Sequence, residues 1–168
     1  MVTIDLITGF LGSGKTTFLK KYAEYLMDQG LHIGILENDF GAINVDMLML
    51  HELRGDQCEL EMIAGGCDAE SHRRRFRTKL ISMRMCGYDR VLVEPSGIYD
   101  VDEFFDVLRE EPLDQWYEIG NVIAILDARL ENNLSQQADY LLASEAANAG
   151  KVILSHADAA TREQCEDT

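Results

Sequence analysis

The residues Gly9-Phe10-Leu11-Gly12-Ser13-Gly14-Lys15-Thr16 match the pattern G-x-x-x-x-G-K-[ST], the sequence signature of a phosphate-binding loop. In such a loop, glycines allow a tight turn whose backbone N–H groups point at phosphate oxygens. Lys15 is expected to reach the β- and γ-phosphates of a nucleotide, and the Thr16 hydroxyl is expected to ligate Mg²⁺. We therefore predict that this segment, called the phosphate loop below, binds a nucleoside triphosphate.

The sequence around the phosphate loop favours the same interpretation, because such a loop joins a strand to a helix. Residues 2–8 are apolar and β-branched, as expected of a strand in a parallel sheet. Residues 16–29 place apolar side chains at helical spacing, and Gly30 follows as a helix stop. The alternative is a glycine turn that joins strand to helix without binding phosphate, and this context disfavours it.

The rest of the chain alternates between strand-like and helix-like segments. Strands are predicted at 32–37, 58–63, 90–94, 121–127 and 151–154, and helices at 69–85, 101–110 and 134–148. This alternation predicts an α/β fold, a three-layer sandwich with a mostly parallel sheet and helices on both faces. We expect one domain over residues 1–168, with ligands bound at the carboxyl ends of the strands.

Charge and composition narrow the function classes. Thirty acidic and fifteen basic residues give a net charge of −15, which opposes binding to nucleic acid or to anionic lipid. A bound nucleotide then depends on local positive charge, so Mg²⁺ is expected as a cofactor. We find no apolar run long enough to span a membrane and no targeting segment, so we expect a cytoplasmic protein. Four irregularly spaced cysteines are expected to be free thiols or metal ligands.

Glu94 follows an apolar strand and precedes Pro95-Ser96-Gly97. An acid at this edge of the sheet can hold Mg²⁺ through a water molecule or orient the water that attacks the γ-phosphate. The Gly97 amide can bond the γ-phosphate and so report hydrolysis. The alternative is a glutamate at a strand end that only meets solvent.

Two aspartates in loops after strands complete the predicted site. Asp39, in the loop after the second strand, is a candidate neighbour of the Mg²⁺ ion in a segment that γ-phosphate would order. Ordinary loop polarity is its alternative. Asp158 follows the last strand, where its carboxylate can accept two hydrogen bonds from the N1 and N2 edge of guanine. A helix cap is the alternative there.

Taken together, these motifs resemble the CobW-type GTPases, relatives of the urease and hydrogenase accessory GTPases. The segment from Gly9 through Thr17 resembles the family's phosphate loop, Asn38-Asp39-Phe40-Gly41 with Asp46 its first switch loop, and Glu94-Pro95-Ser96-Gly97 its Glu-x-Ser-Gly motif. The resemblance implies GTP hydrolysis with Mg²⁺, coupled to delivery of zinc or cobalt to a client metalloprotein or cofactor-assembly enzyme, and dimerisation. The implied nucleotide contacts are Gly12, Ser13, Gly14, Lys15, Thr16, Thr17, Gly97, Ser155, His156 and Asp158, with Lys15 and Glu94 catalytic.

The chain departs from this family in the cysteine motif. The family has Gly-Gly-Cys-x-Cys-Cys, whereas this chain has Gly65-Gly66-Cys67-Asp68-Ala69-Glu70, so Cys67 alone is retained as a metal ligand. One thiolate does not fill a tetrahedral zinc shell. His72, Glu70, Cys58 or a second subunit would have to complete the site, and a structural role for Cys67 is the alternative.

A second departure affects the base. Ser155 and His156 stand where the family has Asn-Lys before the aspartate, so the preference for GTP over ATP depends on Asp158. His156 is expected to stack over the base. The resemblance also implies a final strand and a C-terminal domain beyond the predicted last strand, which these 168 residues do not contain.

Two other functions stay open from sequence. One is an ATP-dependent small-molecule kinase or ligase, which shares the phosphate loop but passes phosphate to an acceptor. The other is a nucleotide-binding scaffold without catalysis. A basic cluster at 72–79 docks an acidic partner, supplies charge to phosphates or forms a solvated helix face, and the last is the favoured interpretation.

Overall fold

A computed structural model describes residues 1–10, 12–39, 49–64, 69–95, 101–129 and 136–160. The elements in chain order are β1 (Val2–Thr8), α1 (Lys15–Asp28), β2 (Ile33–Asp39), η1 (His51–Leu53), β3 (Cys58–Ala64), α3 (Ala69–Arg84), β4 (Arg90–Pro95), α4 (Val101–Leu108), α5 (Leu113–Trp116), β5 (Tyr117–Asp127), α6 (Gln136–Asn148) and β6 (Lys151–Ser155). None of the helices in these ranges is long and apolar enough to cross a lipid bilayer.

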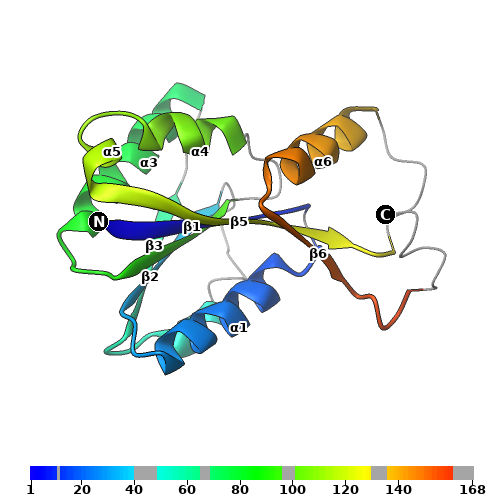
Figure 1. Cartoon of the computed structure of the whole chain (residues 1–168), viewed down its shortest axis with the longest axis horizontal. Helices are drawn as coiled ribbons and strands as arrows, with labels where there is room; N and C mark the ends of the chain where they lie inside the picture. Colours follow the sequence, from blue (N-terminus) through cyan, green and yellow to red (C-terminus); the bar gives the residue numbers. More distant parts are fainter. Residues whose placement is uncertain (11, 40–48, 65–68, 96–100, 130–135, 161–168) are drawn as a thin grey trace.

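The strands form one parallel sheet with the order β3-β2-β4-β1-β5-β6. Helix α1 covers one face of the sheet, and α3, α4 and α6 lie on the other (Figure 1). The predicted three-layer α/β sandwich is therefore confirmed. Because all strands are parallel, their carboxyl ends lie along a single edge, where the phosphate loop leaves β1.

The period-two pattern of β1 divides the core into two layers. Val2, Ile4 and Leu6 belong to the layer under α3 and α4, which also contains Phe76 and Phe104. Ile7 belongs to the layer under α1, together with the α1 residues Leu19, Ala23 and Leu26. The strand is thus apolar on both faces, as a central parallel strand must be.

Strand β5 begins earlier than predicted, at Tyr117 and not at residue 121. Its first half pairs with β1 at a register that shifts between Ile4 and Leu6. Gly120 makes this approach feasible, because a Cβ there would collide with the Asp5 carboxylate. The short elements α5 and η1 were not predicted, since segments of three or four residues carry no readable period. Strand β4 includes Pro95, one residue beyond the predicted strand at 90–94.

A buried carboxylate links three elements near the amino end of the sheet. Asp5 is fully buried, accepts a hydrogen bond from the Tyr22 hydroxyl of α1 at 2.8 Å and another from the backbone amide of Asn121 in β5 at 2.6 Å. The Arg90 guanidinium of β4 lies 3.1 Å from the same carboxylate. The Asn121 side chain also donates to the Tyr22 oxygen at 3.0 Å. The Asp5 charge is therefore buried together with the donors it requires.

Candidate functional site

The phosphate loop has the backbone that its glycines predict. Gly9, Gly12 and Gly14 all have positive φ angles, of 139°, 80° and 91°. Gly14 is the N-cap of α1, and no side chain caps this helix end. The uncapped amides of the first turn and the positive end of the helix dipole suit an anion. This backbone is compatible with a bound phosphate group, and phosphate binding stays a prediction.

Lys15 lies folded back across the loop. Its side chain is 7% exposed, and Nζ donates a hydrogen bond to the Phe10 carbonyl oxygen at 3.1 Å. This contact holds the ammonium group inside the curve of the loop. A bound phosphate has to draw the ammonium away from a neutral acceptor, which a charged phosphate oxygen can do.

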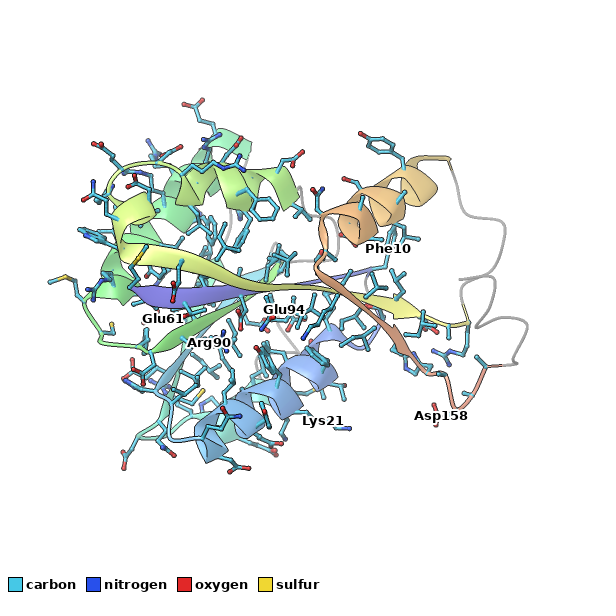
Figure 2. All side chains as sticks on the ribbon, viewed as in Figure 1. Phe10, Lys21, Glu61, Arg90, Glu94 and Asp158 are labelled. Carbon is cyan, nitrogen blue, oxygen red and sulfur yellow. The ribbon has the colours of Figure 1, made fainter. Side chains whose placement is uncertain are left out.

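The loop also touches β4 through a buried hydrogen bond. The Thr16 hydroxyl donates to Glu94 Oε1 at 2.8 Å, and both residues are buried. The two side chains come from α1 and from the carboxyl end of β4, and Figure 2 shows Glu94 at the sheet centre. Hydroxyl and carboxylate oxygens are the ligand types that Mg²⁺ prefers, so this pair fits the expected ion by its donor chemistry.

Sequence reasoning missed a second carboxylate at this edge. Glu37 of β2 is opposite Glu94 in the parallel register and is 3% exposed. Side chains of a strand alternate between the two faces of the sheet, so Glu37 lies on the same face as Ile33 and Ile35, which pack under α1. This is the face that α1, the helix of Thr16, covers. The signal was available, because Glu37 directly follows an apolar run, as Glu94 does.

Three predicted residues cannot be placed as side chains. Asp39 ends β2, but its side chain lies outside the described residues. Cys67 and Gly97 lie wholly outside them. Within the described ranges no group of three or more His, Cys, Asp or Glu residues is arranged to hold a metal ion. Cys58, offered as a helper of Cys67, is buried under α1, and burial raises the pKa of its thiol to about 11.

The segment 155–158, called the base loop below, lies against the phosphate loop. A Cβ placed on Gly14 would be 3.8 Å from the Ser155 Cβ. His156 has a left-handed φ of 53°, and its Nδ1 lies 3.1 Å from Asp127 Oδ2. Asp158 lies beyond it, at the turn after β6 (Figure 2). Within the base loop, Ser155 therefore lies next to Gly14 of the phosphate loop, and the His156 ring contacts the Asp127 carboxylate.

Asp127 is the centre of a small charged cluster that sequence reasoning did not single out. Arg129 donates to it from Nε at 3.0 Å and from Nη2 at 2.8 Å. These hydrogen bonds, with the nearby His156, lower the pKa of the Asp127 carboxyl to about 2. The hydrogen bonds to Asp127 raise the pKa of Arg129, and the charge of the Asp158 carboxylate acts in the same direction. Arg129 therefore lies within the electrostatic reach of both aspartates beside the predicted base site.

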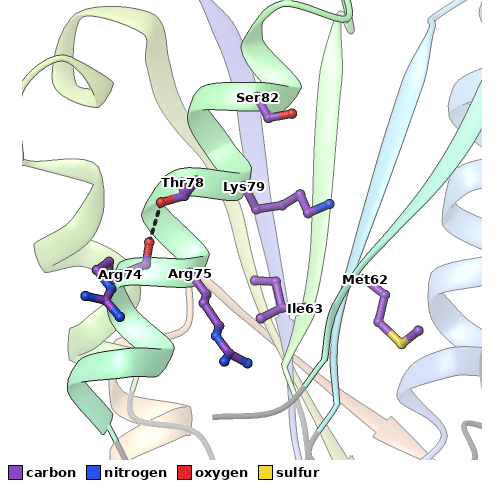
Figure 3. Close-up of a pocket in the computed structure, with 7 residues that line it drawn as sticks. All are labelled: Met62, Ile63, Arg74, Arg75, Thr78, Lys79 and Ser82. Atoms are coloured by element: carbon purple, nitrogen blue, oxygen red, sulfur yellow. Dashed lines mark hydrogen bonds between the residues drawn. The ribbon is translucent and has the colours of Figure 1, made fainter.

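The basic cluster of α3 is largely neutralised. His72 contacts Glu103, Lys79 contacts Glu61, and Arg73 and Arg77 both contact Glu110. The groove between β3 and α3 has a volume of about 520 Å³ and contains no phosphate-loop residue. It is lined by Met62, Ile63, Arg74, Arg75, Thr78, Lys79 and Ser82 (Figure 3). These pairings favour the solvated helix face over a phosphate-binding role.

The fold and the site together define a P-loop nucleotide-binding protein. A family model described as CobW/HypB/UreG, nucleotide-binding domain, matches residues 3–168. The chain belongs to this family, as the sequence motifs predicted. The match covers the phosphate loop, the Thr16 and Glu94 contact and the base loop.

Curated relatives of the chain include two proteins of Escherichia coli (strain K12). The zinc chaperone YeiR is 28% identical over 164 residues, which cover 97% of this chain and 49% of YeiR. The zinc chaperone YjiA is 30% identical over 172 residues, which cover 95% of this chain and 50% of YjiA. The chain thus spans about half the length of these relatives.

Solved structures give the same fold. The Zn(II)-bound YjiA GTPase from E. coli superimposes with a TM-score of 0.59 at 21% identity, covering 99% of this chain and 53% of that one. The signal recognition particle receptor FtsY from Elizabethkingia anophelis superimposes with a TM-score of 0.65 at 18% identity, covering 98% of this chain and 54% of that one. At these identities the likeness concerns the fold alone.

Proposed function

We propose that this chain binds and hydrolyses GTP with Mg²⁺ and that hydrolysis drives delivery of a transition metal, zinc or cobalt, to a client metalloprotein or cofactor-assembly enzyme in the cytoplasm. The observation that carries the hydrolytic part is the buried hydrogen bond of 2.8 Å from Thr16 to Glu94. It joins the phosphate loop to a carboxylate on the neighbouring strand, which is the arrangement that phosphoryl transfer to water uses. The metal-delivery part is supported by the names of YeiR and YjiA as zinc chaperones.

In this proposal the predicted site residues share the work. The amides from Gly12 to Thr17 and the ammonium group of Lys15 bind the phosphates and stabilise the charge that develops on them. Thr16, Glu94 and the predicted ligand Asp39 would hold Mg²⁺, which would supply positive charge to the phosphates. Glu94 orients the attacking water, and the Gly97 amide bonds the γ-phosphate. Asp158 reads guanine.

The test of hydrolysis is phosphate release from Mg-GTP by four proteins: the wild type, Lys15→Ala, Glu94→Gln and the control Glu24→Gln. Glu24 is an exposed residue of α1, so its change removes one carboxylate without touching the site. We expect slow turnover by the wild type and the control, and a loss of about 10²-fold or more in the two site variants. Equal phosphate release by all four proteins would exclude this mechanism.

The kinase or ligase alternative has its own outcome in the same assay. If ATP displaces a labelled GTP analogue as well as GTP does, and phosphate appears only after an acceptor is added, the chain is a transferase. If nucleotide binds and no phosphate is released with or without an acceptor, the chain is a scaffold. The GTPase proposal requires release of phosphate without an acceptor and a preference for GTP that Asp158→Ala removes.

The metal cargo is tested separately, because the cysteine motif is incomplete in this sequence. Zinc and cobalt are titrated into the wild type and Cys67→Ala, each with and without Mg-GTP. We expect tighter binding by the wild type, and a change in affinity when Mg-GTP is present. Metal binding that depends on neither Cys67 nor nucleotide would remove the delivery role and leave the GTPase role standing.

A further inference from the structure

The Asp127 carboxylate, at the end of β5, has no part in the proposed mechanism, yet it is surrounded by donors. Its Oδ1 atom accepts hydrogen bonds from the backbone amide of Arg129 at 2.9 Å and from Nε of the same residue at 3.0 Å. Its Oδ2 atom accepts from Nη2 of Arg129 at 2.8 Å and lies 3.1 Å from Nδ1 of His156. Each oxygen therefore has two neighbours that can donate, which holds the carboxylate in one orientation.

The His156 ring has a second contact through the same nitrogen. Its Nδ1 atom lies 3.2 Å from the Ser155 hydroxyl oxygen, and that hydroxyl donates its hydrogen to the Leu126 carbonyl oxygen at 3.1 Å. Because the Ser155 hydrogen is used in this way, the Ser155 oxygen faces Nδ1 as an acceptor, and so does the Asp127 carboxylate. The hydrogen of the neutral ring therefore lies on Nδ1, and two acceptors from β5 and β6 fix the edge of the ring that carries it.

The backbone of the base loop is held to match. His156 has a left-handed φ of 53°, which is unfavourable for a residue with a side chain unless surrounding contacts maintain it. The Ala128 amide donates to the Ser155 carbonyl oxygen, and the Ala159 amide donates to the His156 carbonyl oxygen, both at 3.0 Å. Backbone and side-chain contacts thus place the His156 ring together.

The held ring lies beside the phosphate loop. That loop leaves β1, while Asp127 ends β5 and Ser155 ends β6, and these three strands are neighbours in the sheet. Ser155 lies next to Gly14, as the distance of 3.8 Å from its Cβ to a Cβ placed on that glycine shows. The His156 side chain is 37% exposed, whereas that of Asp127 is 19% exposed. The site therefore presents an anchored and accessible aromatic ring next to the loop that would hold the phosphates.

We propose that Asp127 is a positioning residue for the nucleotide base, because it holds the His156 ring in the orientation in which that ring packs against the base. Aromatic rings stack on all bases, since every base has a π-face. A ring that is already held loses little rotational freedom when a base arrives, so the contact is stronger than that of a free ring. The inference rests on the proposed nucleotide binding and concerns the affinity for any base, whereas the choice of guanine belongs to Asp158.

The test separates the base from the phosphates. Dissociation constants are measured with Mg²⁺ for a non-hydrolysable GTP analogue and for inorganic tripolyphosphate, which has no nucleoside. The ratio of the tripolyphosphate constant to the analogue constant, called the base ratio below, measures what the nucleoside adds to binding. It also cancels the change in charge that a variant brings to the phosphate site.

The proteins are the wild type, Asp127→Ala, Asp127→Asn, His156→Asn, the double variant Asp127→Ala with His156→Asn, and the control Glu24→Ala. Asparagine replaces His156 because it tolerates a left-handed backbone but has no aromatic ring. Asp127→Asn keeps an oxygen that can accept from Nδ1. Glu24→Ala removes a carboxylate at an exposed position of α1.

We expect the base ratio to fall about fivefold or more in Asp127→Ala and in His156→Asn, which is the lower end of what stacking of a base on an aromatic side chain contributes. The double variant should have the base ratio of His156→Asn alone, because Asp127 has no ring left to position. The base ratio of Asp127→Asn should lie between those of the wild type and Asp127→Ala. Glu24→Ala should keep the wild-type base ratio.

Two results would overturn the inference. One is a wild-type base ratio in Asp127→Ala or in His156→Asn, which would show that the carboxylate or the ring does nothing for the base. The other is a base ratio that falls by the same factor when Asp127→Ala is made in the wild type and in His156→Asn, which would show that Asp127 does not act through the ring. Failure of the wild type to bind the analogue at all would instead refute the proposed function.

Discussion

Replacing Gly34 with alanine tests how closely the sheet face under α3 is packed. Gly34 lies in β2, and a Cβ there would be 2.7 Å from two ring carbons of Tyr88 and 2.9 Å from the Met83 methyl carbon. Tyr88 is 3% exposed, and its hydroxyl donates to Glu59 at 2.6 Å, so the ring cannot simply swing into solvent. The ring must move by about 0.7 Å to restore an ordinary contact of 3.4 Å.

The expected loss in the free energy of unfolding follows from two opposing effects. Forcing an extra carbon into a packed core costs about 1–3 kcal/mol. Replacing a glycine restricts the unfolded chain and returns about 0.4–1 kcal/mol. We therefore expect Gly34→Ala to destabilise the protein by about 1–2 kcal/mol. Gly55→Ala is the control, because a Cβ there meets no atom within 4 Å, and it should be neutral or slightly stabilising.

The assay is urea unfolding of the nucleotide-free protein, followed by far-ultraviolet circular dichroism, with the denaturant slope compared between variants. The same change is also made in a Tyr88→Leu background, which lacks the tyrosine ring. There Gly34→Ala should lower the free energy of unfolding by less than it does in the wild type. If Gly34→Ala and Gly55→Ala have the same stability, or if the cost persists without the Tyr88 ring, the steric reasoning is refuted.

Three further predictions concern charge and thiol chemistry. The pKa of Asp127 is lowered to about 2, so its stabilising effect is present above the ordinary value and is lost as the pH falls toward 2. Asp127→Asn should lower the free energy of unfolding by about 1 kcal/mol at neutral pH, because solvent screens this partly exposed pair. In urea unfolding measured at several pH values, the variant should lose less stability below the ordinary pKa of an aspartate than the wild type does. An equal loss in both proteins would contradict this. Glu110→Ala removes the partly exposed carboxylate that pairs with Arg73, and it should lower the free energy of unfolding by less than about 1 kcal/mol. A larger loss that persists at high salt would show that this ion pair contributes more than an exposed salt bridge does. Iodoacetamide with peptide mass spectrometry should label exposed Cys86 at least about tenfold faster than buried Cys58, and equal rates would show that the Cys58 site opens.

The local parts of the fold could be predicted from sequence because their signals are local. The phosphate loop, the strand before it and the helix after it were predicted and are present, with Gly14 at the helix start. The strand order of the sheet was not predicted, since it depends on contacts between distant segments. The early start of β5 depends on such a contact as well, between Gly120 and Asp5.

The candidate site was predicted where a motif existed and missed where only packing creates it. Glu94 was found through its motif, while Glu37 and Asp127 were not, although each of the three acids directly follows an apolar run. Glu145, a buried acid of α6, had no such signal, because in sequence it is one polar residue in a helix and its burial depends on packing against segments distant in sequence.

The Asp5 cluster has a consequence for how the chain selects one strand alignment. Apolar side chains pack almost equally well when two strands slip by two residues, because the same face stays inward. A buried carboxylate does not tolerate such a slip, since Tyr22, Arg90 and the Asn121 amide would move out of reach and leave its charge without donors. The cluster therefore stabilises one register of β1, β4 and β5, and one position of α1 on the sheet. It thereby selects the register in which β1 pairs with β4 and β5, the two strands on either side of it.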